Sequence, residues 1–223
     1  MPLGDETATH MALLRQSAQA EVAGAIERLL QDGSDRALCR VNPLAFAAAR
    51  GLDEEAVISG FLHAARLGLF DLGWNVLCPS CGGVVHAGAT LKSVDRQEYR
   101  CTFCSIEYQP TLDEIVEVAF TVNPRVRRIA AHDPDSLPIW EYARQLFFGT
   151  GLDLPQDESY ERTLEQVTLE GVDLPAGAKA VLSLQLPEGL IILFDPVTHT
   201  AQFMDVKGEP TRERQSLSMV LST

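Results

Sequence analysis

The sequence predicts an α+β fold with helices in its first third and short strands in its last third. Three observations support this. Apolar residues recur at helical spacing up to about residue 68, two close cysteine pairs lie between Cys78 and Cys104, and short alternating apolar runs dominate beyond residue 156. With 46% hydrophobic residues among 223, the chain is long enough to bury a sizeable core. We therefore expect four regions, at 1–77, 78–110, 111–155 and 156–223.

Residues 8–31 predict one long amphipathic helix that ends at Asp32-Gly33. Its apolar positions are Leu14, Ala18, Val22, Ala25, Ile26, Leu29 and Leu30. The apolar stripe lasts only about three turns, which favours packing on the next domain over a dimerising coiled coil.

Two shorter helices follow, each with clear capping signals. Asn42 before Pro43 predicts the start of the first helix, and Gly51 predicts its end. Asp53 predicts the start of the second, whose first turn carries two glutamates, and Gly68 predicts its end. We expect this second helix to bury one stripe, made of Val57, Ile58, Phe61, Leu62 and Ala65. A strand-like run over 69–77 comes next, so the order of elements predicts a winged helix-turn-helix within residues 1–77.

The charge of this region argues against DNA binding. Residues 34–77 contain no lysine and five acidic residues against four arginines, Arg36, Arg40, Arg50 and Arg66. The second helix begins Asp53-Glu54-Glu55, where a recognition helix would contact bases or phosphates. The whole chain has a net charge of −13, which is also unfavourable for nucleic acid or an anionic membrane. We expect the helix pair to serve protein contacts or domain packing.

The strongest chemical signal is the set of four cysteines. Cys78 and Cys81 form one Cys-x-x-Cys pair, and Cys101 and Cys104 form another after nineteen residues. This spacing predicts a zinc ribbon over 78–110, in which four thiolates bind one structural Zn²⁺ per chain. Iron in a rubredoxin-like site and a redox dithiol are the alternatives. Cys39, the fifth cysteine, lies in an apolar run and is expected to be a small core residue.

Residues 111–155 predict a strand and an aromatic helix. The strand is the β-rich run 115–122, and it is followed by the turn Asn123-Pro124. Three arginines come next, Arg125, Arg127 and Arg128, which would either bind an anion or offset nearby carboxylates. Pro138 opens the helix, whose aromatic residues suit a core or an interface, and 149–151 close it.

The last region, 156–223, predicts a small antiparallel β-sandwich of five short strands separated by Pro/Gly turns. Their markers are Val167 and Leu169, then Leu182, Leu184 and Leu186, then 190–194, then 202–204, then Leu217, Met219 and Leu221. The chain stops at Thr223, within or just after an alternating run. We therefore expect the sequence to be part of a longer protein at least as much as we expect Thr223 to be a natural C-terminus.

Targeting and catalytic signals are not found in the sequence. The first residues lack a signal-peptide pattern, and the longest aliphatic run, 190–194, is far shorter than the ~20 residues of a membrane span. We expect a soluble cytoplasmic protein, in line with an odd cysteine count. There is no phosphate loop, nucleophile elbow or His-Glu-x-x-His motif. The nearest thing to an acid/base cluster, His132 with Asp133 and Asp135, lies in a turn, so we expect no enzyme activity.

Residues 34–150 resemble an uncharacterised domain that precedes the catalytic domain in some bacterial class III adenylate/guanylate cyclases. The resemblance is carried by the Asn42-Pro43 helix start, the run 68–74 ending in Trp74 that leads to Cys78-Pro-Ser-Cys81-Gly82, the second cysteine pair, and the run 120–127. It implies a regulatory module whose partner is another protein or a cyclase catalytic domain in cis. Any cyclase activity would then belong to sequence beyond Thr223.

We therefore expect a non-catalytic, zinc-stabilised regulatory or protein-interaction module with Cys78, Cys81, Cys101 and Cys104 as metal ligands. Two alternatives stay open. One is a winged-helix transcription regulator that binds DNA, and the other is a small-ligand sensor that uses the β domain.

Overall fold

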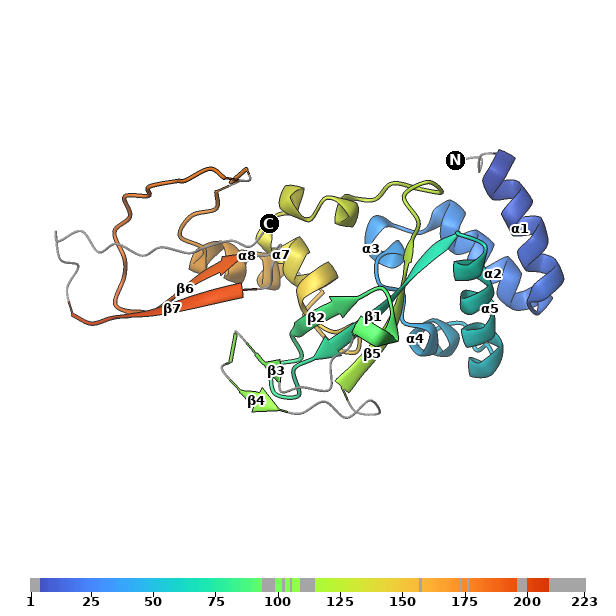
Figure 1. The fold of residues 1–223 in the computed structure, drawn as a ribbon, viewed down its shortest axis with the longest axis horizontal. Helices are drawn as coiled ribbons and strands as arrows, with labels where there is room; N and C mark the ends of the chain where they lie inside the picture. Colours follow the sequence, from blue (N-terminus) through green and yellow to red (C-terminus); the bar gives the residue numbers. More distant parts are fainter. Residues whose placement is uncertain are drawn as a thin grey trace.

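The protein is elongated, with a helical part at one end, a β-hairpin at the other and a three-stranded sheet between them (Figure 1). The computed structural model describes residues 5–93, 99–101, 103–104, 106–108, 115–156, 158–172, 174–175, 177–195 and 200–208. The predicted α+β class is confirmed, since the described residues form helices and small antiparallel sheets. Every helix in these ranges is too short or too polar to span a bilayer.

The single helix predicted over 8–31 is wrong, because the chain folds back on itself there. α1 (Asp5–Ser17) and α2 (Ala20–Asp32) are separated at Ala18-Gln19, where Gln19 has an extended ψ of 140°. Both helices pack on α5 (Glu54–Arg66). Folding back buries Met11 and Leu14, which are at most 1% exposed, so the break brings both ends of the apolar stripe to one core.

The caps predicted for the next helices are confirmed. After the short α3 (Asp35–Leu38), α4 (Pro43–Ala48) begins at Asn42, whose side chain accepts hydrogen bonds from the first backbone N–H groups of the helix. α5 begins at Asp53, which accepts from Ala56 N at 2.8 Å. Gly51 follows α4 and Gly68 follows α5, with φ of +63° and +75°. Glycine adopts a positive φ at little energetic cost, so both helices end where the sequence predicted.

The central sheet is antiparallel with strand order β2-β1-β5. Its strands are β1 (Phe70–Leu77), β2 (Val84–Gly88) and β5 (Val116–Val122). Val41, between α3 and α4, forms a bridge with Phe120 of β5 and so ties the helical part to the sheet. Two very short strands, β3 (Tyr99–Arg100) and β4 (Glu107–Tyr108), pair with each other and form a separate two-stranded sheet.

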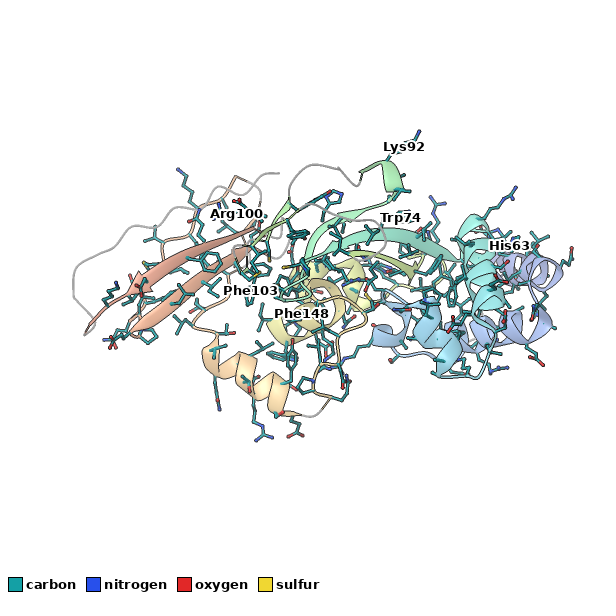
Figure 2. The ribbon with its side chains drawn as sticks, turned by 90° about the horizontal axis from the view of Figure 1, so that it is seen from below. His63, Trp74, Lys92, Arg100, Phe103 and Phe148 are labelled. Atoms are coloured by element: carbon teal, nitrogen blue, oxygen red, sulfur yellow. The ribbon has the colours of Figure 1, made fainter. Side chains whose placement is uncertain are left out.

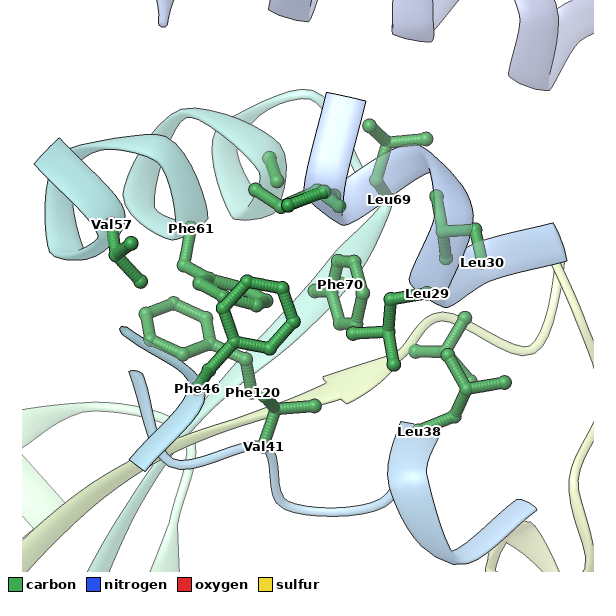
Figure 3. Close-up of a cluster of buried hydrophobic side chains, with 14 of the residues drawn as sticks. Leu29, Leu30, Leu38, Val41, Phe46, Val57, Phe61, Leu69, Phe70 and Phe120 are labelled. Carbon is green, nitrogen blue, oxygen red and sulfur yellow. The ribbon is translucent and has the colours of Figure 1, made fainter. Parts of the chain in front are cut away.

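The main core lies where α5 and α2 cover the start of the sheet (Figure 3). Phe61 of α5 is fully buried, and its ring centroid lies 5.1–5.3 Å from those of Phe46, Phe70 and Phe120. Such aromatic pairs add about 0.5–1.5 kcal/mol each to the free energy gained by burial. This aromatic cluster fixes α4, α5, β1 and β5 as one unit.

The helix predicted to begin at Pro138 is confirmed as α7 (Ile139–Tyr142), which continues into a π-helical turn, η4 (Ala143–Phe147). It is preceded by two 3₁₀ turns, η2 (Ala130–His132), and η3 (Pro134–Ser136). Gly149 follows the helix as predicted.

The five-stranded β-sandwich predicted for 156–223 is wrong in part. The strand marked by Val167 and Leu169 is replaced by α8 (Glu158–Val167), in which Tyr160, Leu164 and Val167 lie at helical spacing. Residues 178–187 form no strand, and Val181 is 93% exposed. The alternating apolar residues of this segment favour a strand only where another strand is available to pair with it.

Two strands of the predicted sandwich are confirmed. β6 (Gly189–Asp195) and β7 (Thr200–Val206) form an antiparallel hairpin. The strand predicted at Leu217, Met219 and Leu221 lies outside the described residues. The described part of this region is therefore one helix and one hairpin.

Candidate metal centre

The first cysteine pair forms a tight loop at the end of β1, and residues 78–83 are called the first knuckle below. Cys78 N donates to Gly83 O at 2.8 Å, and Gly82 N donates to Cys78 O at 2.9 Å. Gly82 has φ +69°, which L side chains rarely adopt. These two hydrogen bonds close a turn that directs the side chains of Cys78 and Cys81 to the same place.

The second pair follows the short strand β3. Cys101 N donates to Ile106 O at 2.9 Å, which closes a turn around Cys104. Tyr108 of β4 connects this turn to the first knuckle, because its hydroxyl donates to Leu77 O at 3.1 Å. The β3–β4 hairpin thus carries the second pair towards the first.

The four sulfur atoms form one compact cluster. The Sγ atoms of Cys78, Cys81, Cys101 and Cys104 all lie within 4.8 Å of one another, and none is in a disulfide. Cys78 Sγ lies 3.4 Å from Cys104 Sγ, and Cys81 Sγ lies 3.7 Å from Cys101 Sγ. Tetrahedral coordination with metal–sulfur bonds of about 2.3 Å requires sulfur–sulfur distances of about 3.8 Å. The cluster could therefore hold one metal ion, with all four positions filled by protein.

The thiols differ in acidity. Burial raises the pKa of Cys81 and Cys101, because it disfavours a thiolate in the protein interior. Burial acts in the same direction on Cys104, but hydrogen bonds from Ile106 N–H and the Cys78 thiol outweigh it and lower its pKa to about 7. A divalent cation would favour the thiolate form of all four side chains.

Both cysteine pairs contact the segment 146–150, which is called the strap below. Gly149 N donates to Gly82 O at 2.8 Å, and Phe148 forms a β-bridge with Gly83. Phe103, between the cysteines of the second pair, lies edge-on to Phe147 with ring centroids 5.5 Å apart. Phe103 and Phe148, labelled in Figure 2, lie in the middle of the molecule. The cluster therefore connects to the C-terminal half through the strap.

Comparison with known proteins gives one result. A family model described as a family of unknown function, DUF5939, matches residues 4–223. The chain belongs to the DUF5939 family. No curated protein and no solved structure matches the chain.

In this DUF5939 chain, the strap is also fixed from its other side by a buried ion pair that sequence reasoning missed. Arg40 and Glu117 pair with only 9% and 8% of their side chains exposed. Arg40 Nη1 donates to the carbonyl oxygens of Leu146 and Phe148 at 2.9 and 2.8 Å. Glu117 accepts from Thr150 Oγ1 at 2.7 Å. The strap is therefore bonded to the knuckle on one side and to this pair on the other.

A signal for this pair exists in the sequence. Glu117 is the one charged residue in the β-rich run 115–122, and Arg40 immediately precedes the bridge residue Val41. A charged residue inside a buried strand requires a partner, but the partner lies 77 residues away. Arg40 also has φ +48°, which local sequence does not predict.

The other predicted candidates have structural roles. His132 accepts from Ile129 N through Nδ1 at 3.1 Å, and its Nε2 lies 2.8 Å from Val122 O, so both ring nitrogens are engaged. Arg127 pairs with Asp35 at 3.4 Å. Cys39 is buried, as predicted, and burial raises its pKa to about 11.

Proposed function

We propose that this DUF5939 protein is a non-catalytic regulatory and protein-interaction module stabilised by one zinc ion on Cys78, Cys81, Cys101 and Cys104. Four thiolates in a tetrahedral set are the usual ligands of structural zinc, and they leave no position open for water or substrate. The near-tetrahedral sulfur distances support a four-coordinate metal site, which iron in a rubredoxin-like site would also fit. The reducing cytosol would keep the thiolates available.

A winged-helix arrangement around the zinc ribbon is supported by the order and pairing of elements. If the short α3 and the elements between β1 and β5 are left out, the order is helix, strand, helix, helix, strand, strand; these are α2, the Val41 bridge, α4, α5, β1 and β5. β5 pairs with both β1 and Val41, as the last strand of a winged helix pairs with the other two. The connection between β1 and β5 takes the place of the wing, and it contains all four cysteines.

The observation that carries the interaction proposal is the outer face of α5. The prediction that Ile58 and Leu62 are buried is wrong: these two residues, one turn apart, are 36% and 47% exposed. Glu54 and Glu55 are exposed in the first turn of the same helix. An apolar stripe bordered by carboxylates suits an apolar groove with a basic rim on another protein, whereas it repels phosphate. A cyclase catalytic domain in cis is the partner that the resemblance of residues 34–150 favours.

The test is to measure the rate of a class III cyclase catalytic domain with and without this chain, fused in cis. We expect the chain alone to form no cyclic nucleotide and to change the rate of the catalytic domain. Leu62→Ser should weaken that effect, and Leu13→Ser, at a residue that is 41% exposed on α1, should not. An unchanged rate in the fusion, or equal effects of both variants, would contradict the proposal.

DNA binding is the second candidate, and the winged-helix order of elements favours it. Binding to a labelled duplex should then fall steeply with salt and be lost in Arg50→Gln or Arg66→Gln. Absence of duplex binding at low salt would exclude it.

A further inference from the structure

A cleft of about 400 Å³ lies between segments 36–50 and 144–156. Four arginines line it, and no Asp or Glu does so in the described part of the chain; the arginines are Arg36, Arg40, Arg50 and Arg144. In a protein with a net charge of −13, such a concentration of positive charge is unexpected unless it meets an anion.

Two of these arginines form no ion pair among the described residues, although Arg144 lies close enough to Glu141 for their charges to interact. Arg36 is paired with Glu141 and Arg40 with Glu117. Arg144 forms no ion pair among the described residues; its Nη2 donates to Pro155 O at 2.6 Å, and its guanidinium lies 4.7 Å from the centroid of the Tyr160 ring.

Arg50 is the second arginine without an ion pair among the described residues. Its guanidinium lies 3.7 Å from the centroid of the Phe46 ring, and its Nη1 donates to Phe46 O at 3.4 Å. The described residues give it no carboxylate partner. Burial and the nearby charge of Arg28 lower its pKa. An anion in the cleft would relieve this repulsion.

Several polar atoms of the lining are buried without a hydrogen-bond partner. They are Arg40 Nε, Arg144 Nε, Arg144 Nη1 and Gln145 Oε1. Arg40 and Gln145 are only 8% and 7% exposed, so water does not replace the missing partner freely. Buried donors and acceptors are normally paired, and an unpaired set in one cleft points to a ligand. Three of the four atoms are donors on guanidinium groups, which suit the oxygens of an anion.

We infer that this cleft binds a small organic anion through a phosphate or carboxylate group held by Arg144 and Arg50. The acceptor Gln145 Oε1 fits a ligand that also carries a hydroxyl or amino group. The inference goes beyond the proposed function, since it needs neither the metal nor a protein partner. The two walls come from segments about 100 residues apart, so the ligand would link the α3–α4 region to the strap.

The test is calorimetric titration of the full chain with inorganic pyrophosphate and, separately, with malonate, each at an ionic strength matched with sodium chloride. We expect one of them to bind with a Kd of about 1 mM or tighter, and the better ligand identifies the anionic group. Arg144→Gln should weaken binding about tenfold or more. Arg66→Gln removes an equal charge from an exposed position on α5 and should leave binding unchanged.

Arg50→Gln serves as a second variant if Arg144→Gln does not fold, as judged by circular dichroism and by the melting temperature without ligand. Failure of both anions to bind the wild-type protein would overturn the inference. Equal binding by wild type, Arg144→Gln and Arg50→Gln would overturn it as well, because it would show only a general effect of anions. Neither result would bear on the zinc site or on cyclase regulation.

Discussion

Replacing Glu117 with glutamine tests whether the buried ion pair holds the strap in place. The carboxylate is 8% exposed and accepts hydrogen bonds from Arg40, Asn75 and Thr150. Removing its charge leaves the Arg40 guanidinium buried without a counter-ion, which costs about 3–5 kcal/mol in comparable pairs. Because the glutamine oxygen can still accept one of these bonds, we expect a loss of about 3 kcal/mol in the free energy of unfolding.

Urea denaturation measures this loss, and a double-mutant cycle isolates the pair. Arg40→Met alone should also destabilise the protein, because Glu117 is then buried without its cation. The double variant should be less destabilised than the sum of the single variants by at least about 1 kcal/mol. Glu158→Gln is the control: it breaks the exposed pair with Arg162, at 3.7 Å, and should change stability by less than about 0.5 kcal/mol. Additive single effects, or a loss for Glu117→Gln as small as in the control, would refute the reasoning.

The pH dependence gives an independent check on Glu117. Burial raises the pKa of this carboxyl, but the charge of Arg40 and the hydrogen bonds from Thr150 outweigh burial and lower the pKa below its ordinary value. The folded protein therefore binds this proton less tightly than the unfolded chain does. The stabilisation is present above the unfolded pKa of about 4.3 and is lost as the pH falls through the folded pKa. Stability should decline less in Glu117→Gln than in wild type over that acid range, and parallel curves would contradict this account.

Two further predictions concern packing and the metal. Gly60→Ala should destabilise the protein by about 1–3 kcal/mol, because the new methyl carbon would lie 2.5 Å from Val22 Cγ1. Gly24→Ala is the control: its methyl carbon would have only Arg28 Nη1 nearby, at 3.5 Å, so this variant should be more stable by about 0.5–1 kcal/mol. Equal effects of the two substitutions in thermal melts would contradict the packing argument. Elemental analysis should give one zinc per chain, lost in Cys101→Ser, with a lower melting temperature; full stability without metal would exclude a structural role. In the folded protein, a thiol reagent should react with four more cysteines after zinc is chelated than before, while Cys39 stays protected. The same number of reactive thiols before and after chelation would contradict protection by the metal.

The parts of the fold that local chemistry determines could be predicted from the sequence. Asn42 and Asp53 satisfy backbone N–H groups a few residues away, and a cysteine knuckle is closed by its own backbone, so spacing alone indicates these elements. The four cysteines come together for the same reason, since each pair is preorganised and only the two pairs must meet.

What could not be predicted depends on contacts between distant residues. The break at Gln19 is favoured by burial of Met11 in the main core, which local propensity does not encode. Val167 and Leu169 alternate and predicted a strand, but the residues just before them have apolar side chains at helical spacing and form α8. The Arg40–Glu117 pair brings together segments 77 residues apart, and the position of Glu117 in a β-rich run signals a partner without identifying it.

The strap joins the features that the structure adds to the sequence. Gly149 is bonded to the first knuckle, and the next residue, Thr150, is bonded to Glu117. Both residues also line the arginine cleft. We therefore expect a change in the cysteine cluster to act first on the buried ion pair and the cleft, because these two consecutive residues contact both the first knuckle and the ion pair. This makes the cysteine cluster a joint between the helical part and the C-terminal half, and loss of one thiolate should disturb function through the position of the strap.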